Sequence, residues 1–154
     1  MNIRLNKPLV VFDLETTGIQ IATDRIVEIY CIKIQPNGEE EHLHQLLNPT
    51  IPIPPEVSKI HGIWDKDVQG QPTFADFAEK LNTFLGDCDF GGFNSNRFDF
   101  PMLAEEFYRA GVAFDTNRKF IDAQRIFHKM EPRNLTAAYK FYCDKDLTDA
   151  HSAK

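Results

Sequence analysis

An apolar run that ends in two carboxylates constrains the fold of this chain more than any other feature of its sequence. The run Leu9–Phe12 consists of strand-forming residues, and Gly18 closes the segment after a Thr-Thr pair. A short continuous apolar run bounded by a turn signal is typical of a buried strand. We therefore predict a buried strand over residues 8–14.

The two carboxylates belong to Asp13 and Glu15, which are separated by one residue. On a strand, residues i and i+2 face the same side, so both side chains project together. Burying two like charges is costly unless a cation neutralises them, and their oxygen atoms suit Mg²⁺ or Mn²⁺. The alternative is a solvated Asp-x-Glu before an ordinary turn, and the pair taken alone favours that alternative.

Two further strands follow the first with short connections. Residues 26–34 alternate, and the turn signal Pro36-Asn37-Gly38 separates them from a third strand that passes through Leu43, Leu46 and Leu47. Three successive strands of this kind predict an antiparallel meander.

The remainder of the chain alternates helical and strand patterns. The segment 48–55 holds four prolines and is not expected to be regular. Thr73 is a plausible N-cap for a helix over residues 74–85, and Pro101 fits the first turn of a later helix that Gly111 ends. The other expected elements are a strand at 88–94, a strand at 120–121, and helices around 126–127 and from Asn134. This order predicts an α/β fold with a mixed five-stranded sheet flanked by helices.

Length and cysteine content predict the size and setting of the protein. The 154 residues are enough for one core, so we expect residues 1–154 to form a single domain. The three cysteines are odd in number and lack a C-x-x-C pair, which predicts a reducing, cytoplasmic setting. The first residues lack a signal-peptide segment and no apolar run could cross a bilayer, so no membrane partner is expected.

The net charge of −6 is unlike the basic character of most nucleic-acid-binding proteins. Clustered carboxylates lower the net charge, however, and bound divalent ions reverse its local sign. One stretch concentrates basic residues and fits equally a rim that binds a nucleic-acid backbone or a solvated helix face. Its members are Arg118, Lys119, Arg125, His128, Lys129 and Arg133.

A second polar constellation places Asp99 at the start of a predicted helix, after a polar loop. Capping explains an acidic residue there, because Asp accepts hydrogen bonds from free N–H groups and interacts with the helix dipole. Taken alone, this position favours capping over a functional site.

Together, these segments resemble the motifs of the DEDD 3′–5′ exonucleases, in particular DnaQ-like proofreading exonucleases of the histidine subtype. Val11–Gly18 resembles the first motif, and Asn94 followed by Phe98-Asp99 resembles the second. His151 and Ala153 resemble the opening of the third motif, H-x-A-x-x-D. The resemblance implies a ribonuclease H-like fold for this mixed sheet.

The third motif is incomplete in this sequence. Its Asp would fall beyond Lys154, so we expect the domain to be truncated inside this motif and to lack the fourth carboxylate. One alternative is that His151 belongs to a frayed tail. Another is the sister motif Y-x-x-x-D, which Tyr142 and Asp146 match in spacing, although Tyr142 also fits the apolar face of a helix.

The resemblance implies roles for individual residues. Asp13, Glu15 and Asp99 would hold two Mg²⁺ (or Mn²⁺) ions, with Asp13 bridging both. His151 would act as general base, as suits a side chain that titrates near neutral pH. The residues expected to contact substrate are Thr16, Thr17, Gly18, His61 and Asn94.

Several of these assignments have simpler alternatives. His61 lies in a His-Gly-Ile segment similar to one of the family, yet a lone His beside Gly is usually structural. Trp64 could stack on a base, with core packing the favoured alternative. Asp122 follows a short strand, where it fits a helix cap or a supporting role better than a metal ligand.

The implied activity is metal-dependent 3′–5′ hydrolysis of DNA with release of nucleoside 5′-monophosphates, in proofreading or repair. The expected partners are nucleic-acid 3′ ends, with single-stranded DNA preferred over RNA, and a DNA polymerase subunit. Two alternatives remain: a catalytically silent nucleic-acid-binding or polymerase-docking module, and an RNA-trimming exoribonuclease. Contacts to the 2′-OH separate DNA from RNA, and no motif reports them.

Overall fold

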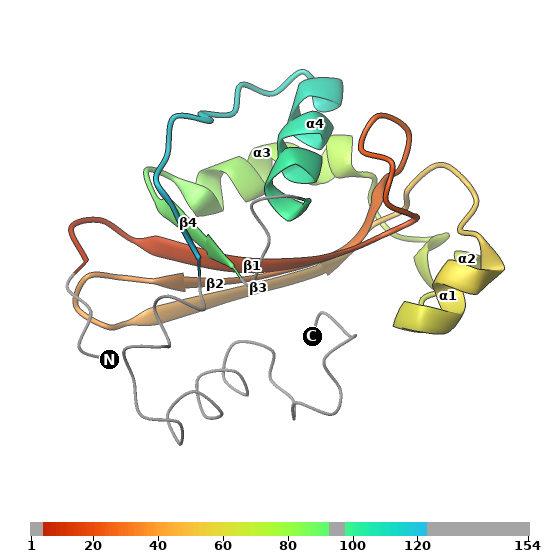
Figure 1. Ribbon diagram of the computed structural model, residues 1–154, viewed down its shortest axis with the longest axis horizontal. Helices are drawn as coiled ribbons and strands as arrows, with labels where there is room; N and C mark the ends of the chain where they lie inside the picture. The colour runs from red at the N-terminus through yellow and green to blue at the C-terminus, as the bar shows by residue number, and fades with distance from the viewer. Residues whose placement is uncertain (1–4, 93–97, 123–154) are drawn as a thin grey trace.

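The computed structural model describes residues 5–92 and 98–122. These residues form a mixed five-stranded sheet with two long helices on one face (Figure 1). The strand order is β3-β2-β1-β4-β5, which places β1 at the centre of the sheet. The predicted mixed sheet of five strands is therefore confirmed.

The first three strands form the predicted antiparallel meander. They are β1 (Leu9–Thr16), β2 (Ile26–Ile34) and β3 (Glu40–Leu46). The strands β4 (Asp89–Gly92) and β5 (Phe120–Asp122) add to the other side of β1 in parallel. Among the described residues, β4 pairs with β1 only over Leu9–Val11.

The helices α3 (Phe74–Leu85) and α4 (Asp99–Ala110) cover one face of the sheet. Thr73 caps α3 as predicted, accepting a hydrogen bond from the Asp76 N–H. Gly111 ends α4 with a φ of 70°, a left-handed conformation that glycine adopts at little cost.

The main core lies between this sheet face and the two helices. The residues of β1 that enter it are Val10, Phe12 and Leu14, every second residue of the strand. Because side chains alternate along a strand, Asp13 and Glu15 point to the opposite face. The hydrophobic pattern of β1 therefore decides which face carries the carboxylates.

Two short helices were not predicted from the sequence. They are α1 (Pro55–His61) and α2 (Asp65–Val68), which begin after the proline-rich segment. Helices of seven and four residues are too short to show a clear apolar period. A small second core accompanies them and consists of Val27, Ile53, Ile63 and Val68.

Trp64 lies between these short helices and is 39% exposed, so the expectation that it packs in the core is wrong. Its backbone N–H donates to the Asp67 carboxylate at 2.8 Å.

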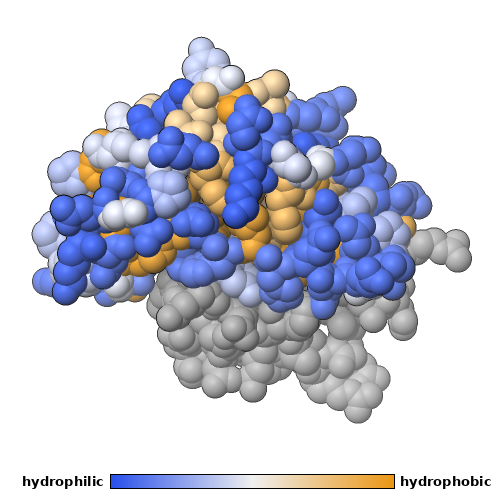
Figure 2. Space-filling view, turned by 180° about the vertical axis from the view of Figure 1, so that it is seen from behind, coloured by the Kyte–Doolittle hydropathy of each residue, from blue (hydrophilic) through white to orange (hydrophobic). Residues whose placement is uncertain are grey.

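The predicted helices around 126–127 and from Asn134 lie outside the described residues. Within the described residues, no helix is long and apolar enough to cross a membrane, and Figure 2 shows apolar side chains among mostly hydrophilic ones on one face.

Candidate active site

The carboxylates of the first motif lie on β1, on the sheet face away from α3 and α4. In the antiparallel register, Asp13 lies opposite Tyr30 and Glu15 lies opposite Glu28. Both acidic side chains are partly buried. In the part of the chain that the structure describes, the last pair between β1 and β4 is at Val11, so both carboxylates lie beyond it along β1.

Asp99 is brought to the same place by α4, of which it is the first residue. The next residue, Phe100, packs edge-on against Phe90 of β4 and Phe120 of β5, with ring centroids 5.6 Å apart in each pair. These aromatic contacts hold the beginning of α4 over the parallel part of the sheet.

The Asp99 carboxyl is buried beside Asp13 and accepts a hydrogen bond from the Leu14 backbone N–H. Burial, and secondarily the charge of Asp13, raise the pKa of Asp99 to about 8, although the Leu14 bond opposes this shift. The preceding residue, Phe98, makes no side-chain cap. The contacts of Asp99 thus point to β1, whereas a capping role would direct them to its own helix.

A divalent cation suits this pair of carboxylates. The charge of Asp13 raises the pKa of the neighbouring Asp99 carboxyl, and hard oxygen ligands of this kind favour Mg²⁺ or Mn²⁺. In residues 5–92 and 98–122, no group of three Asp, Glu, His or Cys side chains is placed to hold a metal ion.

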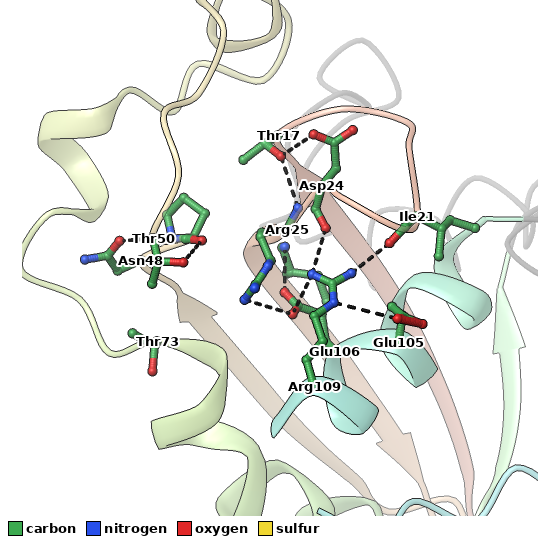
Figure 3. Close-up of polar contacts among 12 residues, drawn as sticks. Thr17, Ile21, Asp24, Arg25, Asn48, Thr50, Thr73, Glu105, Glu106 and Arg109 are labelled. Carbon is green, nitrogen blue, oxygen red and sulfur yellow. Dashed lines mark hydrogen bonds and ion pairs between the residues drawn. The ribbon is translucent and has the colours of Figure 1, made fainter. Parts of the chain in front are cut away.

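The loop that follows β1 is fixed by hydrogen bonds around Asp24 (Figure 3). The Thr17 hydroxyl donates to Asp24 at 2.7 Å and accepts from the Arg25 N–H at 3.0 Å. The other Asp24 oxygen accepts from the Gln20 N–H at 2.8 Å. Thr17 is 1% exposed, so its side chain is a structural part of the loop.

Gly18 lies against this carboxylate, and a Cβ at this position would be 2.5 Å from Asp24 Oδ2. We expect Gly18→Ala to destabilise the fold by about 1–3 kcal/mol, because Asp24 is held by its two donors and cannot yield freely. Gly70→Ala is the matched control, since a Cβ at Gly70 meets nothing within 4 Å. Urea unfolding midpoints of both variants measure the difference, and equal midpoints would contradict the expectation.

His61 lies below the end of β1 and is 9% exposed. Its Nε2 lies 3.1 Å from the Thr16 carbonyl oxygen, and its Nδ1 accepts the Ile63 N–H at 3.1 Å. These partners require the neutral ring with the proton on Nε2, which then donates to Thr16. Burial lowers the pKa of His61, although the Thr16 bond and the charge of Glu28 oppose the shift. The ring thus holds the backbone of the first motif.

Replacing His61 should therefore remove a pH-dependent contribution to stability. Because the pKa of His61 is lowered in the folded state, its contribution is present above the unfolded value of about 6.5 and is lost as pH falls. We expect His61→Ala to cost about 1–3 kcal/mol at pH 8, since it leaves the Thr16 carbonyl and Ile63 N–H without this partner. The difference from wild type should shrink towards pH 5 in urea titrations; a difference constant with pH would argue against this account.

Glu28 is a residue of this face that the sequence interpretation did not single out. It is 4% exposed, and His44 Nε2 of β3 lies 2.6 Å from its Oε2. On the same face, the Tyr30 hydroxyl lies 3.0 Å from His42 Nδ1. The sequence did offer a signal for Glu28, since it is an acidic residue within an alternating apolar strand. Such a residue is rarely fully buried without a partner.

The structure also changes the interpretation of the basic stretch. The Arg118 guanidinium donates to the carbonyls of Gly86 and Cys88 and lies over the rings of Phe90 and Phe114, so it is an internal brace. These contacts give Arg118 a structural role, which neither interpretation of the basic stretch included. Lys119 is exposed, and the other four members, Arg125, His128, Lys129 and Arg133, lie outside the described residues.

Several predicted site residues also fall outside the described residues. They are Asn94, His151, Tyr142 and Asp146. Another candidate emerges only from the structure: Ile19, next to the first motif, is 81% exposed. Ile19 directly follows the Thr-Thr-Gly segment of the first motif, which makes it a candidate for contact with substrate.

The fold and the paired carboxylates define a ribonuclease H-like nuclease domain. The fold matches E. coli exonuclease I in complex with a dT13 oligonucleotide, with a TM-score of 0.67 and 20% identity over 82% of this chain and 31% of that chain. The family model of the RNase_T exonucleases matches residues 10–153, so the chain belongs to this family. The resemblance to DnaQ-like exonucleases is confirmed at the family level, and members of the family use divalent metals.

Two curated relatives are much longer proteins in which one segment is similar to this chain. The PolC-type DNA polymerase III of Mycoplasma genitalium is 32% identical over 136 residues, which cover 88% of this chain and 9% of that protein. The 3′-5′ exonuclease DinG of Staphylococcus aureus is 28% identical over 141 residues, 92% of this chain and 15% of that protein. The chain thus spans about a tenth of the former relative and about a seventh of the latter.

Proposed function

We propose that this chain is a 3′–5′ exonuclease domain that hydrolyses the terminal phosphodiester bond of single-stranded DNA and releases nucleoside 5′-monophosphates. The observation that supports this most directly is the meeting of Asp99 with Asp13, from segments far apart in the sequence. Membership of the exonuclease family agrees with it. The names of the relatives, a DNA polymerase III and a 3′-5′ exonuclease, favour DNA and a replication or repair setting.

The acidic residues would hold two Mg²⁺ or Mn²⁺ ions, which supply positive charge to the phosphate and acidify water when bound. Asp13 would serve both ions, a role supported by its charge acting on Asp99 and by the strand face that it shares with Glu15. His151 is the proposed base that takes a proton from the attacking water. The proton would pass to its imidazole, which neutral pH leaves free to accept it.

The loop after β1 would receive the terminal nucleotide. The backbone of Thr16, Thr17 and Gly18 is held in place from behind by Asp24 and His61, and Ile19 is exposed next to it. Such a rigid polar backbone beside an apolar side chain fits a sugar and a base face. In this proposal His61 acts by fixing the Thr16 carbonyl, while Asn94 remains a proposed direct contact.

The test is digestion of a 5′-labelled single-stranded DNA oligonucleotide by the protein in its full natural length. With Mg²⁺ we expect a ladder that shortens from the 3′ end and nucleoside 5′-monophosphates as products, while EDTA abolishes both. An RNA oligonucleotide of the same sequence should be cut more slowly. Binding without digestion in Mg²⁺ and Mn²⁺ would support a silent binding module, and faster digestion of RNA would support an RNA-trimming enzyme.

A further inference from the structure

The helix α4, which carries Asp99 at its beginning, makes further contacts near its end with the loop that follows the first motif. Glu106 and Arg109 lie in the last turns of α4 and contact the loop after β1 and the start of β2 (Figure 3). Neither residue belongs to a motif. Both lie away from the carboxylates, so direct contact with the reacting phosphate is not their role.

Arg109 connects α4 to the loop through two backbone carbonyls. Its Nη2 donates to the Ile21 carbonyl at 2.7 Å, and its Nη1 donates to the Asp24 carbonyl at 3.1 Å. The planar guanidinium spans both acceptors at once, which a lysine ammonium cannot reproduce. Arg109 therefore fixes the distance between α4 and the loop.

Glu106 makes the corresponding connection to β2. It is 2% exposed, and its Oε2 accepts the Ile26 N–H at 3.0 Å. Its Oε1 lies 3.4 Å from Arg109 Nη1 and 3.7 Å from Arg25 Nη1. A buried ionic cluster is often no more stabilising than apolar residues of similar volume, so stability alone does not account for it.

These two connections bear on the position of Asp99. At the beginning of α4, Asp99 accepts the Leu14 N–H of β1. At its end, Arg109 holds the loop that starts at Thr17, directly after the same strand. A helix attached to β1 at its beginning and to the loop after β1 at its end is restrained from sliding along this strand and from rotating over it.

We infer that Glu106 and Arg109 are positioning residues that set α4 along β1 so that Asp99 faces Asp13. The inference rests on the proposed exonuclease function, since it assigns these residues a part in the same site. Misplacing a catalytic group by about 1 Å can cost about 100-fold in rate. Loss of this attachment should therefore lower kcat by misplacing Asp99. KM should change less, because Thr17 of the proposed substrate loop keeps its own hydrogen bonds to Asp24 and Arg25.

The test compares Arg109→Met with Lys33→Met. Lys33 is a matched control because its Nζ also donates to a backbone carbonyl across the sheet–helix interface, that of Phe84 at 2.7 Å. We expect Arg109→Met to lower kcat about 10- to 100-fold with KM within about threefold. Arg109→Lys should recover part of the loss, and Lys33→Met should keep the wild-type kcat.

Amide hydrogen exchange at Leu14 gives a readout that needs no activity. Its N–H is held by Asp99, so its exchange should accelerate in Arg109→Met and Glu106→Gln but not in Lys33→Met. Equal Leu14 exchange and wild-type kcat in the folded Arg109→Met protein would overturn the inference. A wild-type protein that digests no DNA would instead refute the proposed function, and Leu14 exchange would still decide whether Arg109 positions Asp99.

Discussion

Replacing Asp13 with Asn is expected to lower kcat/KM for 3′ digestion of single-stranded DNA by more than about 100-fold. Asn keeps the shape of the side chain and removes the charge that faces Asp99 across the site. Loss of a residue that merely supports a metal ligand costs about 10- to 100-fold. A residue proposed to hold both ions should therefore cost more. Initial rates at saturating Mg²⁺ measure the effect.

The control for this variant is Asp87→Asn. Asp87 has an 84% exposed side chain and pairs with Lys7 at 3.4 Å on the surface, so its loss should leave the rate within about twofold. Asp13→Asn should also be at least as stable as wild type without metal, because it removes a like charge beside Asp99. Retention of more than a tenth of the wild-type rate would refute the assignment of Asp13.

The fold followed from local patterns that have direct physical causes. The apolar residues of β1 determined a buried strand, and their alternation beyond Phe12 placed Asp13 and Glu15 on one face. The caps at Thr73 and Gly111 set the ends of α3 and α4 because each satisfies backbone groups locally. Such strands and helix ends can be predicted from the sequence, because the residues that determine them lie within a few positions of one another.

Contacts between distant segments could not be predicted in this way. The sequence indicated Asp99 only through its motif and favoured capping when taken alone, whereas its hydrogen bond to Leu14 depends on how α4 docks. Arg118 has the composition of a binding residue but turns inward to carbonyls and aromatic rings. Arg109 belongs to no motif. Its proposed positioning role depends on hydrogen bonds to two carbonyls in a loop more than eighty residues earlier in the chain.

The second large effect is expected at Asp99 itself, in the metal-free protein. Burial and the charge of Asp13 raise the pKa of Asp99 to about 8 from its ordinary value of 3.8, so the folded state keeps a proton that the unfolded chain releases. Stability is then highest at low pH and falls as pH rises from about 4 to about 8. Over this range, one proton of difference changes the folding equilibrium constant by up to about tenfold per pH unit.

Asp99→Asn should remove this fall in stability with rising pH, because the amide resembles the protonated carboxyl and does not ionise. We expect the variant and wild type to be similarly stable near pH 4 and the variant to be more stable at pH 8 in EDTA. Other titrating groups such as His61 and Glu106 are present in both proteins, so their contributions cancel in the difference. Denaturant unfolding across this pH range measures that difference.

Adding Mg²⁺ should reverse the order of the two proteins. A cation binds the ionised carboxylate, so it should stabilise wild type increasingly as pH rises and displace the proton of Asp99 on binding. Asp99→Asn lacks that carboxylate and should gain little from Mg²⁺ while also losing activity. If wild type showed no pH-dependent stabilisation by Mg²⁺ or Mn²⁺, Asp99 would not be a metal ligand. The raised pKa of Asp99 would then not mark a metal site, because a proton and a metal ion compete only when both bind the same carboxylate.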